Sequence, residues 1–298
     1  MMTRREWGVG WAALLIGCSR KAEPAAPPAA VPSATERLAQ LERETGGRFG
    51  VAAWDLARDR RLAYRESERF LMCSTFKLPL AGAILRRVDA GQESLSRRIE
   101  YDASALIDPS PITAAHLTEG SMTVEQMCHA MVTTSDNAAA NSLLKAIGGP
   151  PALTAFFHDL GDTTSRLDRY EPDLNTYTAD DERDTTTAAA MLHVTRALLV
   201  ADGVLSPASR QHLGDWLAAA TTGLQRLRSA FPPNLRAGDK TGTGDNGATN
   251  DIAIAWRPSA KPLLVVAYSY GLPEDLDARS EVIGRVGRIV VDGLGVSE

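Results

Sequence analysis

The sequence predicts an α+β fold, in which both chain ends form an antiparallel sheet lobe with flanking helices beside a central all-helical lobe. Alternating, β-rich stretches occur near both ends, at residues 49–64 and 251–270, whereas residues 95–222 carry mostly helical periodicity. Strands that are adjacent in sequence favour antiparallel pairing. A helical insertion between two halves of a sheet indicates two lobes, with the candidate site at the junction where pockets tend to lie.

Each predicted element follows from a local pattern. Ser33 and Glu36 form a capping box before a first helix that ends at Gly46-Gly47, and residues 49–56 and 60–64 form a hairpin. The remaining predicted helices cover residues 75–89, 124–132, 138–147, 151–160, 187–200, 206–220 and 279–294, and the remaining strands cover 251–256 and 263–270.

Length and composition describe an ordinary globular chain. A chain of 298 residues is long enough to bury a sizeable core. Its residues are 44% hydrophobic and 23% charged, which is ordinary for a globular protein. The formal net charge is −5, and no block of like charge occurs. This balance argues against nucleic acid or an anionic membrane surface as the main partner.

The first residues are typical of an export signal. Arg4 and Arg5 precede an apolar run over residues 7–17, which is too short to span a bilayer as a mature helix. The run ends directly before Cys18 and resembles a bacterial lipobox, in which this cysteine is lipidated. An ordinary cleaved signal and a twin-arginine signal are the alternatives. Because residue 19 is serine rather than aspartate, the resemblance implies a lipid anchor in the outer membrane, on the periplasmic side.

The chain therefore divides into three parts. Residues 1–18 are the predicted lipoprotein signal, residues 19–33 are an Ala/Pro-rich tether, and residues 34–298 are the folded domain. Within that domain, the sheet lobe is predicted to comprise residues 34–68 and 223–298, and the helical lobe residues 69–222.

The tetrad Ser74-Thr-Phe-Lys77 contains a candidate nucleophile. On a helix, residues three apart share one face, so the lysine stem passes beside the serine hydroxyl. A serine becomes nucleophilic when a neighbouring base removes its proton, and a lysine with a lowered pKa can be that base. By itself, the tetrad is also explained by a helix N-cap and a solvated lysine.

Two further short motifs offer partners for Ser74. Ser135-Asp-Asn137 follows a predicted helix and supplies a second hydroxyl and an amide. Lys240-Thr241-Gly242-Thr243 precedes a predicted strand and supplies a positive charge, two hydroxyls and a glycine that lets a ligand approach the backbone. Each motif alone is also explained as a turn or a Gly-rich edge strand.

In this order, the three motifs resemble the constellation of the serine β-lactamase and DD-peptidase superfamily, from about residue 35 to the C-terminus. A long polar segment separates the branches of that superfamily. Its Glu171-Pro-x-x-Asn175 resembles the omega loop of class A β-lactamases. The resemblance implies that Glu171 is a general base, that Asn175 helps to hold the hydrolytic water, and that Arg169 and Asp184 pair across the base of the loop.

The resemblance implies a two-step hydrolysis of small-molecule β-lactam antibiotics without a cofactor or a metal. Ser74 attacks the lactam carbonyl, either Lys77 or, through a water, Glu171 takes its proton, and Ser135 delivers a proton to the lactam nitrogen. Glu171 then activates the water that releases the acyl group. Backbone N–H groups of Ser74 and Thr243 are the implied oxyanion hole.

The resemblance also assigns substrate-binding groups. Asn137 is implied to hold a substrate carbonyl, while Lys240, Thr241 and Thr243, with Gly242 between them, bind the substrate carboxylate. Arg226, 14 residues before Lys240, matches an alternative position for an arginine near that carboxylate. A solvated arginine at a helix end is the other explanation.

Three positions depart from the family pattern. Pro109 stands where many members have an aromatic residue at the pocket entrance. Cys73 would pair with a cysteine at position 244 in some members, but that residue is Gly244, and the family partner of Cys128 is replaced by Ala81. We therefore expect two unpaired, largely buried thiols.

Two other functions remain as alternatives. A penicillin-binding DD-peptidase would be acylated by penicillin and would release it slowly, but it lacks the Glu171–Asn175 arrangement. A non-catalytic β-lactam sensor would need a signalling segment. The five histidines show no ligand spacing, which argues against a zinc β-lactamase. A monomer is the default in the family.

Overall fold

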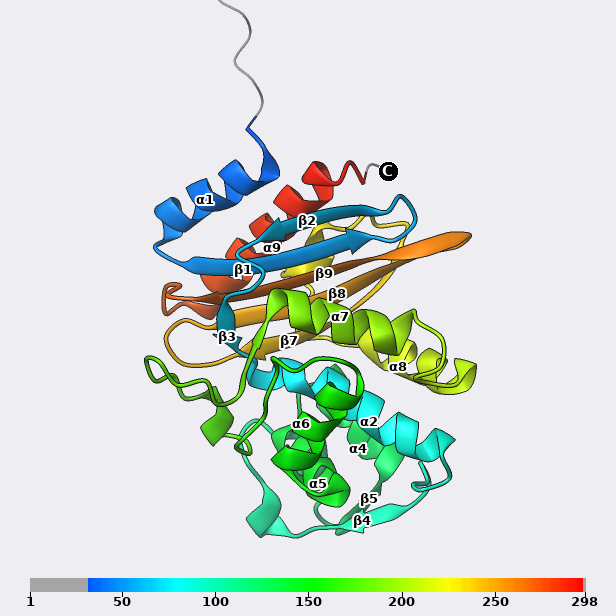
Figure 1. The fold of residues 1–298 in the computed structure, drawn as a ribbon. Coiled ribbons are helices and arrows are strands. Elements are labelled where there is room, and N and C mark those ends of the chain that lie inside the picture. The colour runs from blue at the N-terminus through cyan, green and yellow to red at the C-terminus, as the bar shows by residue number, and fades with distance from the viewer. Residues whose placement is uncertain (1–31, 297–298) are drawn as a thin grey trace, which may run out of the picture. The chain divides into compact units, whose positions relative to one another are not determined.

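The computed structural model describes residues 32–296, which form one compact unit. The predicted signal peptide, Cys18 and most of the tether lie outside the described residues. A five-stranded antiparallel sheet in the order β2-β1-β9-β8-β7 runs through the unit (Figure 1). Its strands are β1 (Arg48–Asp55), β2 (Arg60–Tyr64), β7 (Arg236–Thr243), β8 (Thr249–Arg257) and β9 (Ala260–Tyr270). The prediction that both chain ends build one antiparallel sheet is confirmed.

Strand β9 is central in the sheet and buried on both faces. Leu263, Val265 and Ala267 belong to one hydrophobic core. Their neighbours Leu264 and Val266 belong to the other core. Because side chains alternate across a strand, a strand that faces two cores appears in the sequence as a continuous apolar run.

The first core lies between the sheet and the two terminal helices, α1 (Ala34–Thr45) and α9 (Leu276–Gly293), which contact one another (Figure 1). The predicted capping box of Ser33 and Glu36 is present at the start of α1. Helix α9 begins three residues earlier than predicted, because the Asp275 side chain accepts a hydrogen bond from the N–H of Ala278 and caps it there.

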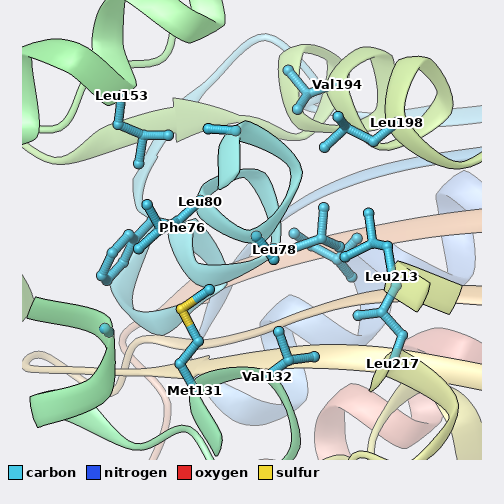
Figure 2. Close-up of a cluster of buried hydrophobic side chains, with 14 of the residues drawn as sticks. Phe76, Leu78, Leu80, Met131, Val132, Leu153, Val194, Leu198, Leu213 and Leu217 are labelled. Atoms are coloured by element: carbon cyan, nitrogen blue, oxygen red, sulfur yellow. The ribbon is translucent and has the colours of Figure 1, made fainter. Parts of the chain in front are cut away.

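The second core surrounds α2 (Lys77–Asp89) on the opposite face of the sheet. Figure 2 shows Phe76, Leu78 and Leu80 pointing toward side chains of the surrounding helices, such as Met131 and Leu217. These helices are α4 (Val124–Thr133), α5 (Asn137–Ile147), α6 (Pro150–Asp159), α7 (Ala188–Leu199) and α8 (Pro207–Ala218), with the short α3 (Pro111–Ala115) beside α4. Helices α7 and α8 also contact the sheet, so they connect the two parts of the predicted two-lobe architecture.

Several short elements were not predicted. The helix expected from residue 75 begins at Lys77 and is preceded by a tight 3₁₀ turn, η1 (Cys73–Phe76), whose first residue has a positive φ of 45°. Two-residue periodicity is too weak to predict the three-residue strands β3 (Arg69–Leu71), β4 (Arg98–Glu100), β5 (Ser121–Thr123) and β6 (Thr185–Thr187), which pair as β3–β6 and β4–β5. The other 3₁₀ turns are η2 (Ala103–Ala105), η3 (Asp173–Asn175) and η4 (Leu227–Ala230).

Across residues 32–296, no helix has the length and apolarity that a bilayer crossing needs.

Close packing of β7 on α8 leads to a test of the fold. A Cβ added at Gly238 would lie 2.7 Å from the carbonyl carbon of Leu217 and 2.8 Å from the backbone nitrogen of Ala218. Gly238→Ala is therefore expected to lower the free energy of unfolding by about 1–3 kcal/mol in urea titrations, since backbone atoms must shift. Arg236→Ala, which removes an exposed ion pair on the same strand, should cost less than about 1 kcal/mol. A Gly238→Ala protein as stable as the parent would contradict this packing.

Candidate active site

Ser74 lies on the η1 turn, which packs against the sheet. The Thr75 hydroxyl donates to the Met72 carbonyl at 2.6 Å and lies 2.9 Å from the Tyr268 hydroxyl on β9. A Cβ at Gly242 on β7 would lie 2.8 Å from the Met72 carbonyl oxygen. The glycine of the Lys-Thr-Gly motif is thus required by the close approach of β7 to the turn that carries the serine.

Lys77 is fully buried, and its ammonium is the point on which the site converges. Nζ donates to Ser74 Oγ at 2.8 Å, to the Ser135 carbonyl at 2.8 Å and to Asn137 Oδ1 at 2.6 Å. It also lies 3.1 Å from Glu171 Oε1. Burial lowers the pKa of Lys77, while the Glu171 carboxylate acts in the opposite direction. The predicted contact between the serine and the lysine three residues later is confirmed.

Ser135 lies between two lysines in the turn that joins α4 to α5. Its backbone has a positive φ of 60°, and its carbonyl accepts a hydrogen bond from Lys77 Nζ. Its hydroxyl oxygen is 3.3 Å from Lys77 Nζ and 3.1 Å from Lys240 Nζ. Asp136 caps α5 by accepting a hydrogen bond from the N–H of Ala139 at 2.9 Å.

Asn137 uses most of its amide within the protein. Its Oδ1 accepts from Lys77, and its Nδ2 donates to the carbonyl of Asp108 at 3.0 Å. The side chain therefore also fixes the segment that contains Pro109, where the structure has a cis Asp108–Pro109 peptide. An amide nitrogen has two N–H groups, so one remains for a ligand.

Glu171 contacts both the candidate nucleophile and Asn175. Its Oε1 accepts from Ser74 Oγ at 2.9 Å, and its Oε2 accepts from Asn175 Nδ2 at 2.5 Å. Only 3% of its surface is exposed. Burial alone would raise the pKa of Glu171, but the Lys77 charge and the hydrogen bonds from Ser74 and Asn175 hold it below the usual value. The carboxylate is therefore ionised at neutral pH.

Two devices hold the loop that carries Glu171 (residues 166–184). Arg169 Nε pairs with Asp184 Oδ2 at 2.5 Å, as the family resemblance implied, and Asp184 Oδ1 accepts the N–H of Arg169 at 2.9 Å. Asn141 grips the backbone of Glu171 from both sides, accepting its N–H at 3.0 Å and donating to its carbonyl at 2.9 Å. Asn141 was not predicted as a site residue, although its position one helical turn after Asn137 is a usable signal.

Successive side chains of strand β7 point to opposite faces of the sheet. Lys240 and Gly242 face Ser135 and the η1 turn, and Lys240 Nζ also donates to the Thr241 carbonyl at 2.8 Å. Burial, and then the charge of Lys77, lower the pKa of Lys240 to about 7. At this pKa, Lys240 is close to losing its proton at neutral pH. A bound anionic ligand would favour the protonated, charged form, so Lys240 is a candidate anion-binding residue.

The threonines of β7 face the segment after α8. Thr241 Oγ1 lies 2.7 Å from Thr222 Oγ1, and Thr243 Oγ1 accepts from Arg226 Nη2 at 2.8 Å. Arg226 is 4% exposed and also donates to the carbonyl of Gly242 at 2.9 Å. The alternative explanation of Arg226 as a solvated arginine at a helix end is therefore wrong. Thr222 was missed, since nothing in its local sequence marks it.

Both thiols of the described chain are unpaired and buried, as predicted. Burial raises the pKa of Cys73 and of Cys128. A Cβ at Gly244 would lie 2.6 Å from the Cys73 sulfur. Within residues 32–296, no group of three or more His, Cys, Asp or Glu side chains could hold a metal ion.

The geometry defines a serine acyl-transfer site, because one hydroxyl lies within hydrogen-bonding distance of both an ammonium and a carboxylate. Comparisons with known proteins agree with this class. A family model described as the beta-lactamase enzyme family matches residues 33–294.

Relatives and solved structures identify the family more closely. Beta-lactamase AST-1 of Nocardia asteroides is 44% identical over 88% of this chain and 84% of its own length. Beta-lactamase OXY-2 of Klebsiella oxytoca is 42% identical over 87% of this chain and 89% of its own length. The structure of the class A beta-lactamase of the last common ancestor of Gram-negative bacteria is 55% identical, with a TM-score of 0.84, and covers 87% of this chain and 98% of that chain. This chain belongs to the class A β-lactamases.

Proposed function

We propose that the protein hydrolyses β-lactams through an acyl-enzyme on Ser74, which is released by water that Glu171 activates. The observation that carries this proposal is the position of Ser74 Oγ, 2.8 Å from Lys77 Nζ and 2.9 Å from Glu171 Oε1. A nucleophile that contacts two candidate bases can lose its proton on attack and regain it on release.

In acylation, Ser74 Oγ bonds to the lactam carbonyl carbon, and its proton passes through a water to Glu171, or to Lys77 after this lysine has given one of its protons to Glu171, 3.1 Å away. The lactam C–N bond then breaks, and the nitrogen takes a proton from the Ser135 hydroxyl. Ser135 is reprotonated by Lys77, whose Nζ lies 3.3 Å from its oxygen, and Lys77 regains a proton from Glu171, which is then ionised again. The N–H groups of Ser74 and Thr243 stabilise the oxyanion.

In deacylation, the ionised Glu171 takes a proton from water, and the resulting hydroxide attacks the ester carbon. The ester bond breaks, and the proton returns to Ser74 Oγ. Asn175 contacts Glu171 through Nδ2, and its buried Oδ1 has no hydrogen-bond partner within the described protein. That oxygen is an acceptor that can hold the attacking water.

Substrate is held by its carboxylate at the end of β7. Lys240 supplies charge, Thr241 and Thr243 supply hydroxyls, and Arg226 adds charge through its contact with Thr243. Gly242 keeps this strand close to the Ser74 turn. Asn137 holds a substrate carbonyl with its remaining N–H. The protein acts as a monomer in this proposal.

Removing Glu171 is expected to block only the second step. Glu171→Ala should be acylated by benzylpenicillin and should release product about 100- to 10,000-fold more slowly, because a general base is lost. Intact-protein mass spectrometry over time should show a persistent adduct on Ser74. Glu182→Ala, in the same loop but exposed, is the matched control and should turn over normally. Normal turnover by Glu171→Ala would remove Glu171 from the mechanism, and a stable adduct on the parent protein would indicate a penicillin-binding protein.

The lowered pKa of Lys240 predicts a pH effect on substrate capture. Above its pKa of about 7, the free enzyme loses the ammonium that attracts the carboxylate, so kcat/KM should fall as pH rises. The fall should approach about tenfold per pH unit well above that value. Lys240→Arg keeps its charge and should lack this alkaline limb, even if its maximum is lower. An identical alkaline limb in both proteins would assign it to another group.

We also propose that the protein is exported and anchored by lipid at Cys18, on the periplasmic side of the outer membrane. The support is the apolar run that stops at Cys18 and the Ala/Pro-rich segment that follows. Cys18→Ala should move the protein from the membrane fraction to the soluble periplasmic fraction after cell fractionation. Membrane association that survives Cys18→Ala would contradict lipidation at this residue.

A further inference from the structure

Asn250 is a fully buried amide on β8, directly behind the site. Its Nδ2 donates to the carbonyl of Leu71 at 2.9 Å, with a longer contact of 3.4 Å to the carbonyl of Met72. Its Oδ1 accepts the N–H of Ser269 on β9 at 3.0 Å. The side chain therefore ties the backbone just before Ser74 to the central sheet.

The backbone of Leu71 and Met72, to which Asn250 donates, is connected to two catalytic segments. The Met72 carbonyl accepts from the N–H of Thr75 at 3.2 Å and from its hydroxyl at 2.6 Å, which shapes the Ser74 turn. The Met72 N–H donates to the carbonyl of Asp184 at 2.8 Å, at the base of the loop that carries Glu171. A shift of Leu71 and Met72 would therefore move the nucleophile.

The backbone of Asn250 holds the opposite end of the site. Its carbonyl accepts from Arg226 Nη1 at 2.8 Å, and the same nitrogen donates to Gly242 on the adjacent strand. The other guanidinium nitrogen, Nη2, donates to Thr243 Oγ1. The next residue, Asp251, accepts the N–H of Leu227 at 3.0 Å and so fixes the segment that carries Arg226.

We propose that Asn250 is a positioning residue that sets the spacing between the nucleophile Ser74 and the carboxylate-binding pair of Arg226 and Thr243. This inference rests on the proposed function. A β-lactam must place its carbonyl at Ser74 while its carboxylate binds at the end of β7. When two such contacts must form together, a misplacement of about 1 Å can cost about 100-fold in rate.

The test compares a charged substrate with its neutral ester in Glu171→Ala protein, where acylation alone is observed. Acylation by benzylpenicillin and by benzylpenicillin methyl ester is followed by intact-protein mass spectrometry. Asn250→Asp keeps the size of the side chain and the acceptor for Ser269, but replaces the donor that faces Leu71. We expect it to slow acylation by benzylpenicillin about 100-fold, and acylation by the ester by less than about threefold, since the ester lacks the anionic contact.

Asn250→Ser is the second variant. Ser209→Ala is the control, because this change removes the hydrogen bond from the Ser209 hydroxyl on α8 to Asp89, far from the site. The control should leave both rates unchanged. Equal losses for both substrates would overturn the proposal, since Asn250 would then act on Ser74 alone. Failure of both Asn250 variants to fold would overturn it as well, because the residue would then serve folding. If Glu171→Ala alone forms no adduct with benzylpenicillin, the proposed function itself fails.

Discussion

The buried ammonium of Lys77 is the interaction on which the site depends. An unpaired charge in the interior is very costly, so a buried lysine requires acceptors on every side. Here they come from three separate segments: the η1 turn through Ser74, the α4–α5 turn through Ser135 and Asn137, and the loop of Glu171. One charge therefore draws together parts of the chain that are about a hundred residues apart, and it aligns the nucleophile with its candidate bases.

Strand β7 carries buried charged residues on both of its faces. Lys240 is buried near Lys77, and this like charge adds to burial in lowering its pKa. On the other side of β7, Asp239 is also buried, 2.6 Å from an Arg228 nitrogen, and burial raises the pKa of Asp239 to about 6. The strand thus presents Lys240 toward Ser135, while the carboxyl group of Asp239 lies on the other side and pairs with Arg228.

The Glu171 loop has little regular structure, so polar contacts hold it in addition to Leu167 and Leu174, which are buried in the second hydrophobic core. Asn141 satisfies both backbone groups of Glu171, and Asp184 accepts two backbone N–H groups at the base of the loop. The carbonyl of Asn175 also accepts the N–H of Asp245 in the turn after β7. A loop that is fixed by hydrogen bonds can hold a carboxylate at one distance from the nucleophile while most of its own side chains remain in solvent.

The sequence by itself determined the long helices and strands, the antiparallel sheet and the motifs that carry Ser74, Lys77 and Glu171, but not the short helix α3, the three-residue strands or the 3₁₀ turns. Helix and strand periods and capping boxes are local patterns, and the motifs are short enough to be recognised by spacing. Only the tertiary structure decided that Arg226 is buried behind Thr243 and that Asn250 joins the two ends of the site. Those contacts link residues 17 and 179 positions apart, and a hydrogen bond between distant residues leaves no periodic trace in the sequence. The tight η1 turn was likewise decided by packing, since β7 lies directly against it.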